Sequence, residues 1–246
     1  MLILDVGNSR IKWGWWQRRE FLRLGSAATA ADLPGPNDLG LPSNVTAPRV
    51  CAVSVSAEDT QRRLADAVRG KWGVTVEFLS GSGTYRGVRC AYGDPTRLGV
   101  DRWAAIIGGY ARYGLPLAVV DCGTALTVDY VDGQGRHRGG VIAPGLTTMR
   151  RSLHGGTARL PQVEGPAAGL LADNTADAIR NGTFEMLAGG IERIVRAAAA
   201  AEPEGREPVY VITGGDAAAL LPRLAVTFVH DPQLVLHGAA LMAEAA

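Results

Sequence analysis

The chain has 246 residues, a length that fits one large domain or two small ones. Its 25 Lys and Arg residues nearly balance 24 Asp and Glu residues, which argues against a polyanion-binding surface and therefore against a nucleic-acid partner. With 47% hydrophobic residues, no apolar run near the ~20 residues that cross a bilayer, and three cysteines without metal-ligand spacing, the composition predicts a folded cytoplasmic protein with no membrane segment and no disulfide scaffold.

Short β-branched runs bounded by turn residues alternate with longer helical patterns along the chain. The predicted strands are Leu2–Asp5, Val50–Val55, Val74–Phe78, Leu117–Asp121 and Val209–Thr213. The predicted helices are Glu58–Arg69, Thr96–Tyr113, Asn174–Ala201 and Gln233–Ala243. Because strands alternate with helices, the sequence predicts an α/β fold.

The two halves of the chain contain an internal repeat. The start reads LILDVGNSRIKWGWW, and the segment after Pro116 reads AVVDCGTALTVDYVDGQG; each is a strand, an Asp-x-Gly turn and a returning strand. The turn aspartates, Asp5 and Asp121, lie 116 residues apart. Chance similarity of two short hairpins is the alternative, and the near-equal halves argue against it. The repeat predicts two related domains, residues 1–115 and 116–246.

Both turns have residues suited to an anionic ligand. A Gly directly after a strand lets the backbone approach phosphate oxygens, and neighbouring Asn, Ser or Thr groups donate hydrogen bonds. Asp5 and Asp121 stand at equivalent strand ends, where a carboxylate either holds a hard cation or stabilises the turn itself. Lys12, on the first returning strand, would reach a transferring phosphoryl group, or else is an exposed strand residue.

Three further segments are candidates for ligand contact. Tyr92–Arg102 places Asp101 beside Arg102, a pair that would bind a small acid and take up a proton, or would form an ordinary surface ion pair. Gly139–Met149 predicts a helix start whose amino end faces a ligand, or a plain strand-to-helix turn. Val211–Ala217 contains two glycines that suit the close approach of a nucleobase or ribose.

Six motifs taken in order resemble the type III pantothenate kinases. They are DVGNSRIKWG, YGDPTRLGVDRW, DCGTALTVD, GGVIAPG, DNTADAIRNG and TGGDA, and they span nearly the whole chain. The resemblance implies two related actin-like (ribonuclease H-like) domains with an ATP cleft between them. It also implies ATP-dependent phosphorylation of pantothenate at its 4′-hydroxyl, the first step of coenzyme A biosynthesis.

The resemblance assigns roles residue by residue. The first phosphate motif corresponds to Asp5, Val6, Gly7, Asn8, Ser9, Arg10, Ile11 and Lys12, and the second contains Thr124. Asp101 matches the catalytic base, Asp121 the ligand of a monovalent cation (K⁺ or NH₄⁺), and Asp5 would organise Mg²⁺ through water. The pantothenate-contacting positions are Tyr92, Gly99, Val100, Asp101, Arg102 and Thr175. The family works as a homodimer whose substrate site borrows residues from the partner subunit.

Two other functions compete with this assignment. One is a non-enzymatic accessory factor for gene expression, which the retained Asp5, Lys12, Asp101 and Asp121 disfavour. The other is a kinase of the same superfamily that acts on a sugar or on acetate. The Cys122 thiol beside the second turn adds a separate hypothesis, sensitivity of the activity to oxidation.

Overall fold

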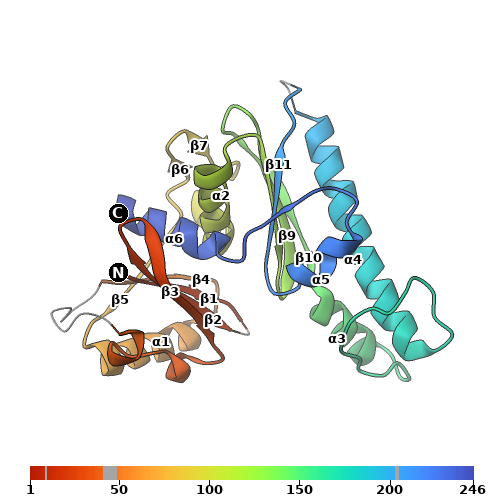
Figure 1. Cartoon of the computed structure of the whole chain (residues 1–246), viewed down its shortest axis with the longest axis horizontal. Coiled ribbons are helices and arrows are strands. Elements are labelled where there is room, and N and C mark those ends of the chain that lie inside the picture. The colour runs from red at the N-terminus through yellow and green to blue at the C-terminus, as the bar shows by residue number, and fades with distance from the viewer. Residues whose placement is uncertain (9, 41–48, 203–204) are drawn as a thin grey trace. The chain divides into compact units, whose positions relative to one another are not determined.

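A computed structural model describes residues 1–8, 10–40, 49–202 and 205–246 of the chain, which form two compact units (Figure 1). The first unit comprises Met1–Arg86, Tyr92–Arg112 and Gln233–Ala246. The second comprises Gly87–Ala91 and Tyr113–Pro232. The contacts therefore group residues 233–246 with the first unit, and the sequence-based domain division at residue 115 stays a prediction.

The first unit is built on a five-stranded sheet in the order β3-β2-β1-β4-β5. Its strands are β1 (Leu2–Val6), β2 (Ile11–Gln17), β3 (Glu20–Ala27), β4 (Val50–Ser54) and β5 (Val76–Phe78). Strand β1 runs antiparallel to β2 and parallel to β4. The helices of this unit are α1 (Glu58–Trp72), α2 (Val100–Tyr113) and α6 (Leu234–Ala245), with 3₁₀ turns at Ala30–Asp32, Asn37–Leu39 and Pro95–Arg97 and the short strand β6 (Thr84–Tyr85).

Alternation along β1 decides which face each helix covers. Leu2, Leu4 and Val6 point to one face and pack in a single cluster with Leu64, Val68 and Trp72 of α1. The ring of Trp15 on β2 stacks on that of Trp72, with centroids 6.2 Å apart. Helix α6 also packs against β1, β2 and β4. Asp5 points to the face opposite α1, since its neighbours Leu4 and Val6 point toward that helix.

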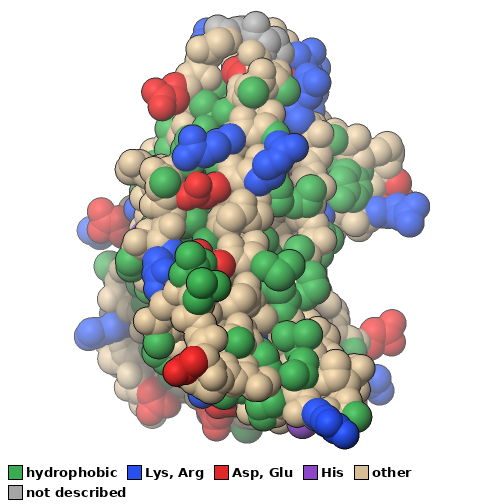
Figure 2. All heavy atoms as spheres, turned by 90° about the vertical axis from the view of Figure 1, so that its right-hand side faces the viewer, with side chains coloured by type: hydrophobic (Ala, Val, Ile, Leu, Met, Phe, Trp, Pro, Cys, Tyr) green, Lys and Arg blue, Asp and Glu red, His purple; other side chains and the backbone are tan. Residues whose placement is uncertain are grey.

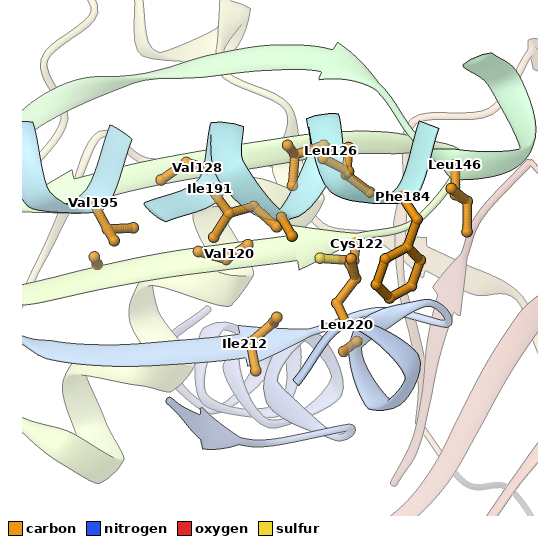
Figure 3. Packing of buried hydrophobic residues seen from close by; sticks show 14 of the residues in the cluster. Val120, Cys122, Leu126, Val128, Leu146, Phe184, Ile191, Val195, Ile212 and Leu220 are labelled. Carbon is orange, nitrogen blue, oxygen red and sulfur yellow. The ribbon is translucent and has the colours of Figure 1, made fainter. Parts of the chain in front are cut away.

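The second unit has a five-stranded sheet in the order β10-β9-β8-β11-β12. Its strands are β8 (Leu117–Cys122), β9 (Ala125–Val131), β10 (His137–Pro144), β11 (Val209–Thr213) and β12 (Val229–His230), and the short β7 (Val88–Arg89) precedes them. Its helices are α3 (Leu146–Gly156), α4 (Thr175–Ala200) and α5 (Ala217–Leu220), with a 3₁₀ turn at Leu221–Arg223. Residues of α4, among them Phe184 and Ile191, cover one face of this sheet (Figure 3).

The two sheets have the same topology. In each, the first strand lies in the middle, antiparallel to the next strand along the chain and parallel to the fourth, and the fifth strand adds in parallel. The predicted internal repeat and the α/β fold class are therefore confirmed. Among the described residues, no helix is both long and apolar enough to span a membrane.

The boundaries of one predicted helix are wrong. The helix expected from Thr96 begins at Val100, because residues Pro95–Arg97 form a separate 3₁₀ turn. The carboxylate of Asp94 stabilises that turn by accepting hydrogen bonds from the backbone N–H of Thr96 at 3.0 Å and from its hydroxyl at 2.6 Å. Leu98 is extended, so the chain restarts a helix only after Gly99.

Candidate active site

The first hairpin turn joins β1 to β2 at the carboxyl end of β1. The backbone N–H of Gly7 donates to the carbonyl of Arg10 at 3.1 Å and closes the turn. Val6 and Ile11 are buried and anchor its two ends, whereas Asn8 and Arg10 are exposed. Ser9, predicted to belong to the same phosphate motif, lies outside the described residues. The turn thus exposes polar side chains at the surface, while buried apolar residues hold its two ends.

Asp5 and Lys12 are paired across this hairpin. They are register partners on antiparallel strands, so their side chains share one face of the sheet. Ser26 of β3 is the next partner in the same row, and its hydroxyl accepts a hydrogen bond from Arg10 at 2.7 Å. A carboxylate and an ammonium group therefore lie together beside the turn, as a site for a phosphate and its cation requires.

The second hairpin repeats this plan with a shorter turn. Gly123 N–H donates to the carbonyl of Ala125 at 3.1 Å, so the turn spans one residue fewer than that of the first hairpin. Asp121 is the last residue but one of β8, as Asp5 is of β1, and its antiparallel register partner is Thr127, where the first hairpin has a lysine. Thr124, predicted to contact ATP, is exposed at the tip of the turn.

The start of α3 is held directly against the second turn. The carbonyl oxygen of Thr124 accepts from Gly145 N–H at 3.0 Å and from the Thr148 hydroxyl at 2.6 Å. A Cβ atom on Gly145 would overlap the carbonyl oxygen of Gly123 and lie 2.8 Å from that of Thr124. The predicted helix start after Pro144 is confirmed, and Gly145 is required there by close backbone packing.

The glycine turn after β11 closes on the same hairpin from the other side. Asp216 N–H donates to the carbonyl of Cys122 at 3.0 Å, and Gly214 adopts a positive φ of 97°. A Cβ on Gly214 would lie 2.5 Å from Asp121 Oδ1, whereas one on Gly215 would meet nothing within 4 Å. Gly214 therefore serves protein packing, and only Gly215 leaves open space of the kind expected for a nucleotide.

Asp101 and Arg102 lie in the first turn of α2. Arg102 is buried, and its guanidinium donates to the Tyr92 hydroxyl at 3.2 Å. Asp101 Oδ1 accepts from the Arg102 backbone N–H at 2.7 Å, and a Cβ on Gly99 would lie 2.6 Å from that same oxygen. Glycine at position 99 thus lets the Asp101 carboxylate fold back on the start of the helix.

The start of α2 lies at the sheet edge where the first hairpin turn is found. A Cβ on Gly99 would be 3.7 Å from the side chain of Val55, which follows directly on β4. Because β4 is parallel to β1 and ends level with it, this is also the edge where Asp5 lies. The first unit therefore brings the Asp101–Arg102 pair and the Asp5–Lys12 pair to one edge of its sheet.

Thr175 is in the second unit, at the first position of α4. It is exposed and follows Asn174, whose side chain accepts from the Asp177 backbone N–H at 3.0 Å and caps the helix. The other predicted pantothenate contacts, Tyr92 and residues 99–102, belong to the first unit. A substrate contact at Thr175 stays a prediction.

The Cys122 thiol is enclosed by apolar side chains. Figure 3 shows it in the cluster that contains Phe184, Ile191 and Leu220. Burial, together with the negative charges of Asp121 and Asp216, raises the pKa of this thiol far above its usual value. Because the reactive species is the thiolate, the structure disfavours the hypothesis that oxidation of Cys122 controls activity.

Sequence reasoning missed one polar residue at the second turn. Thr213 ends β11 as the register partner of Asp121, it is fully buried, and its hydroxyl has no hydrogen-bond partner in the structure. It lies in the motif TGGDA, in which no role was predicted for the threonine. The strand pairing that brings it beside Asp121 joins distant parts of the chain, and no local pattern signals it.

Comparison with known proteins identifies relatives over the whole chain. A family model described as type III pantothenate kinase matches residues 1–197. The type III pantothenate kinase of Alkalilimnicola ehrlichii is 39% identical over 245 residues, 98% of this chain and 97% of that protein. That of Halorhodospira halophila is 39% identical over 247 residues, covering 96% and 95% of the two chains.

Solved structures are similar in fold at low sequence identity. A structure named for 2-dehydro-3-deoxygalactonokinase from Sinorhizobium meliloti superimposes with a TM-score of 0.61 at 15% identity, covering 99% of this chain and 98% of that one. An activator of 2-hydroxyisocaproyl-CoA dehydratase from Clostridium difficile, with bound ADPNP, gives a TM-score of 0.51 at 12% identity over 99% and 94% of the chains. These neighbours agree with the predicted actin-like fold.

Proposed function

The chain belongs to the type III pantothenate kinases, and we propose that its two hairpins and the start of α2 divide the work of the kinase reaction among them. The enzyme transfers a phosphoryl group from ATP to pantothenate, a step of coenzyme A biosynthesis. Phosphoryl transfer depends chiefly on positioning and on stabilising negative charge, so each segment is assigned one of these tasks.

The observation that carries the proposal is the arrangement at the start of α2. Asp101 accepts the proton of the pantothenate 4′-hydroxyl as the hydroxyl oxygen attacks the terminal phosphorus of ATP, and the bond from that phosphorus to the bridging oxygen breaks to release ADP. The hydrogen bond from Arg102 N–H to Asp101 Oδ1 fixes the carboxylate for that task. The Arg102 guanidinium, oriented by Tyr92, receives the pantothenate carboxylate, with the backbone at Gly99 and Val100 completing the contact.

The first hairpin binds the phosphates of ATP. Backbone groups of the turn and the exposed side chains of Asn8 and Arg10 surround phosphate oxygens, and Lys12 places its ammonium near the transferred group. Thr124 at the second turn contacts the nucleotide from the other hairpin. Lys12 suits this role because it shares the sheet face of Asp5 and is the second residue of β2, close to the turn.

Two cations complete the charge balance. Asp5, a carboxylate at a strand end, would hold Mg²⁺ through water, and the metal would neutralise charge on the phosphates. Asp121 would hold K⁺ or NH₄⁺. The second site fits such a cation because an unpartnered buried hydroxyl, that of Thr213, lies on the same face as the Asp121 carboxylate.

A homodimer acting in the cytoplasm is part of the proposal. The second unit exposes several large apolar side chains, namely Ile142, Leu170, Leu171 and Met186. Figure 2 shows apolar side chains scattered between charged ones on one face of the molecule. An interface between subunits would cover side chains of this kind, and it would let Thr175 contribute to a site in the partner. Equilibrium sedimentation that finds only monomer at assay concentrations would remove the shared site.

The decisive experiment is a coupled phosphorylation assay with purified protein, ATP, Mg²⁺ and pantothenate, in potassium and then in sodium alone. Turnover in potassium that falls sharply in sodium is the expected result and supports the cation role of Asp121. Acetate and glucose as acceptors serve as controls for the other kinases of the superfamily. Folded protein that turns over glucose but not pantothenate would overturn the proposal, and turnover of none would favour the accessory-factor alternative.

A further inference from the structure

The second hairpin has three oxygen-bearing side chains in one row. Asp121 of β8 is the register partner of Thr127 on β9 and of Thr213 on β11. Partners directly opposite one another point to the same face of a sheet, so the two threonines flank the aspartate on the face away from α4. One carboxylate and two hydroxyls form a donor set made entirely of oxygen.

The first hairpin, which has the same strand topology, lacks this set. Asp5 has Lys12 as its partner on one side and Val53 on the other. An ammonium group and an apolar side chain thus occupy the places of the two hydroxyls. The same scaffold therefore supplies its own positive charge at the first turn and supplies oxygen atoms at the second.

The Thr213 hydroxyl lacks a protein partner. It is fully buried, and it makes no hydrogen bond in the structure. Buried hydroxyls are rarely left in this state, because they lose their hydrogen bonds to water and gain nothing in return. A cation that binds oxygen ligands would be coordinated by the oxygen of this hydroxyl, and the hydroxyl proton would point away from the cation.

The turn after β11 keeps the row compact. Gly214 follows Thr213, and a side chain there would press on Asp121 Oδ1, since its Cβ would lie 2.5 Å from that oxygen. Glycine thus lets the end of β11 approach the carboxylate closely. Asp216 follows two residues after Gly214 and is not part of the row. It is half-buried, and burial raises its pKa.

We propose that Thr213 and Thr127 are oxygen ligands of the monovalent cation held at Asp121, with the buried Thr213 hydroxyl as the principal one. Potassium is bound in proteins by oxygen atoms that replace its hydration shell, and this row provides three side chains for that purpose. The inference rests on the proposed function for the presence of the cation at Asp121. The threonine ligands are assigned from strand register and burial alone.

The test measures cation binding without catalysis. Thermal unfolding is followed in potassium chloride titrated against choline chloride at constant ionic strength, with wild type, Thr213→Val and the matched control Thr227→Val, which changes an exposed residue away from the row. Potassium should raise the unfolding midpoint of wild type and of the control equally. In Thr213→Val we expect the half-saturating potassium concentration to rise about tenfold or more.

The unfolding midpoint measured without potassium separates a loss of potassium binding from a loss of fold stability. Valine has the shape of threonine without the hydroxyl, so in choline alone Thr213→Val should unfold at or above the wild-type midpoint. Thallium NMR with Tl⁺ as a potassium substitute provides a direct reading of binding by the same variants. An unchanged potassium titration or an unchanged thallium signal in Thr213→Val would overturn the proposal and would leave a buried water as the partner of the hydroxyl.

A second variant gives the second hairpin the residue that the first hairpin has at the equivalent position. Thr127→Lys places an ammonium where the first hairpin carries Lys12, so it should remove the response of the unfolding midpoint to potassium. A potassium response that persists in Thr127→Lys would count against the row as the cation site. If wild type phosphorylates pantothenate and Thr213→Val still binds potassium normally, the inference fails while the proposed function stands. If wild type binds potassium through Thr213 but does not phosphorylate pantothenate, the proposed function fails while the threonine ligands stand.

Discussion

His137 Nε2 lies 2.9 Å from Asp129 Oδ1, and both side chains are buried between neighbouring strands β9 and β10. The other ring nitrogen, Nδ1, accepts from the Ala91 backbone N–H at 3.4 Å, so the Nε2 proton is donated to Asp129. The histidine therefore ties the segment Gly87–Ala91 to the second sheet. That segment leads directly into Tyr92, one of the proposed substrate contacts.

Replacing this histidine should destabilise the fold. His137→Ala removes a buried hydrogen bond to a carboxylate and leaves a cavity, and we expect the free energy of unfolding to fall by about 2–4 kcal/mol. Urea unfolding monitored by circular dichroism measures the change. His230→Ala, at an exposed position on β12, is the control and should stay within about 0.5 kcal/mol of wild type. Equal behaviour of the two variants would show that the buried pair contributes nothing.

Asp101→Asn should abolish most of the activity without unfolding the protein. The amide keeps an oxygen that can accept from Arg102 N–H, but it cannot take up the proton of the acceptor hydroxyl. We expect kcat to fall about 100- to 10,000-fold, measured in the coupled assay under saturating substrates. Asp59→Asn, on the exposed side of α1, changes the same groups away from the site and should keep full activity. A folded Asp101→Asn enzyme with wild-type kcat would exclude the residue as the base.

Arg102→Lys should affect substrate binding more than the chemical step. A lysine ammonium cannot reproduce the planar two-pronged contact with a carboxylate, nor the hydrogen bond of the guanidinium to the Tyr92 hydroxyl. The expected result is a KM for pantothenate raised about tenfold or more, with the KM for ATP unchanged. The exposed Arg97→Lys, in the preceding 3₁₀ turn, is the matched control. A fall in kcat at constant KM would assign Arg102 to the reacting phosphate.

Gly145→Ala and Gly155→Ala should change stability in opposite directions. A methyl group at position 145 would collide with the backbone of the second turn, so we expect a loss of about 2–4 kcal/mol and weaker ATP binding. At position 155, inside α3, a Cβ meets nothing within 4 Å, and alanine should add about 0.5–1 kcal/mol. Denaturant unfolding and nucleotide titration check both. A harmless Gly145→Ala would mean that the start of α3 does not rest on the turn.

Thiol labelling should distinguish the three cysteines. Cys51 and Cys122 are buried, and burial raises the pKa of Cys51 to about 11, whereas Cys90 is partly exposed. At pH 7 to 9 the Cys51 thiolate is therefore a minor species, and an aromatic disulfide reagent should modify Cys90 first. Mass spectrometry of labelled peptides locates the modified residue, and denatured protein should label at all three positions. Rapid modification of Cys122 in the folded enzyme would restore the oxidation hypothesis.

The sequence contains local signals for the hairpins and for the motif residues within them. Asp5 and Asp121 could be placed at strand ends because the apolar run before each, and the glycine after it, are contiguous in the chain. The edge strand β3 was not predicted, because its residues are mostly exposed and show no simple apolar alternation. The Thr96 boundary failed because Asp94 favours a 3₁₀ turn over the first turn of a helix.

Contacts between distant segments were beyond prediction from the sequence alone. The role of Thr213 depends on β11 pairing with β8 in a register that places it opposite Asp121. The need for glycine at position 145 likewise appears only when α3 is folded onto the turn of Thr124. Local patterns identify which residues are polar or small, but the sheet pairing determines which of them meet.

The return of α6 to the first unit has a consequence for the order of events during synthesis. Gly238 of α6 packs so tightly on Ala104 of α2 that no side chain would fit between them, and α6 also packs on β1 and β4. A ribosome delivers Tyr113–Pro232 before it delivers α6. The first sheet therefore cannot receive its full cover until the last residues of the chain have been made, although its strands β1 and β2 are the first to be synthesised.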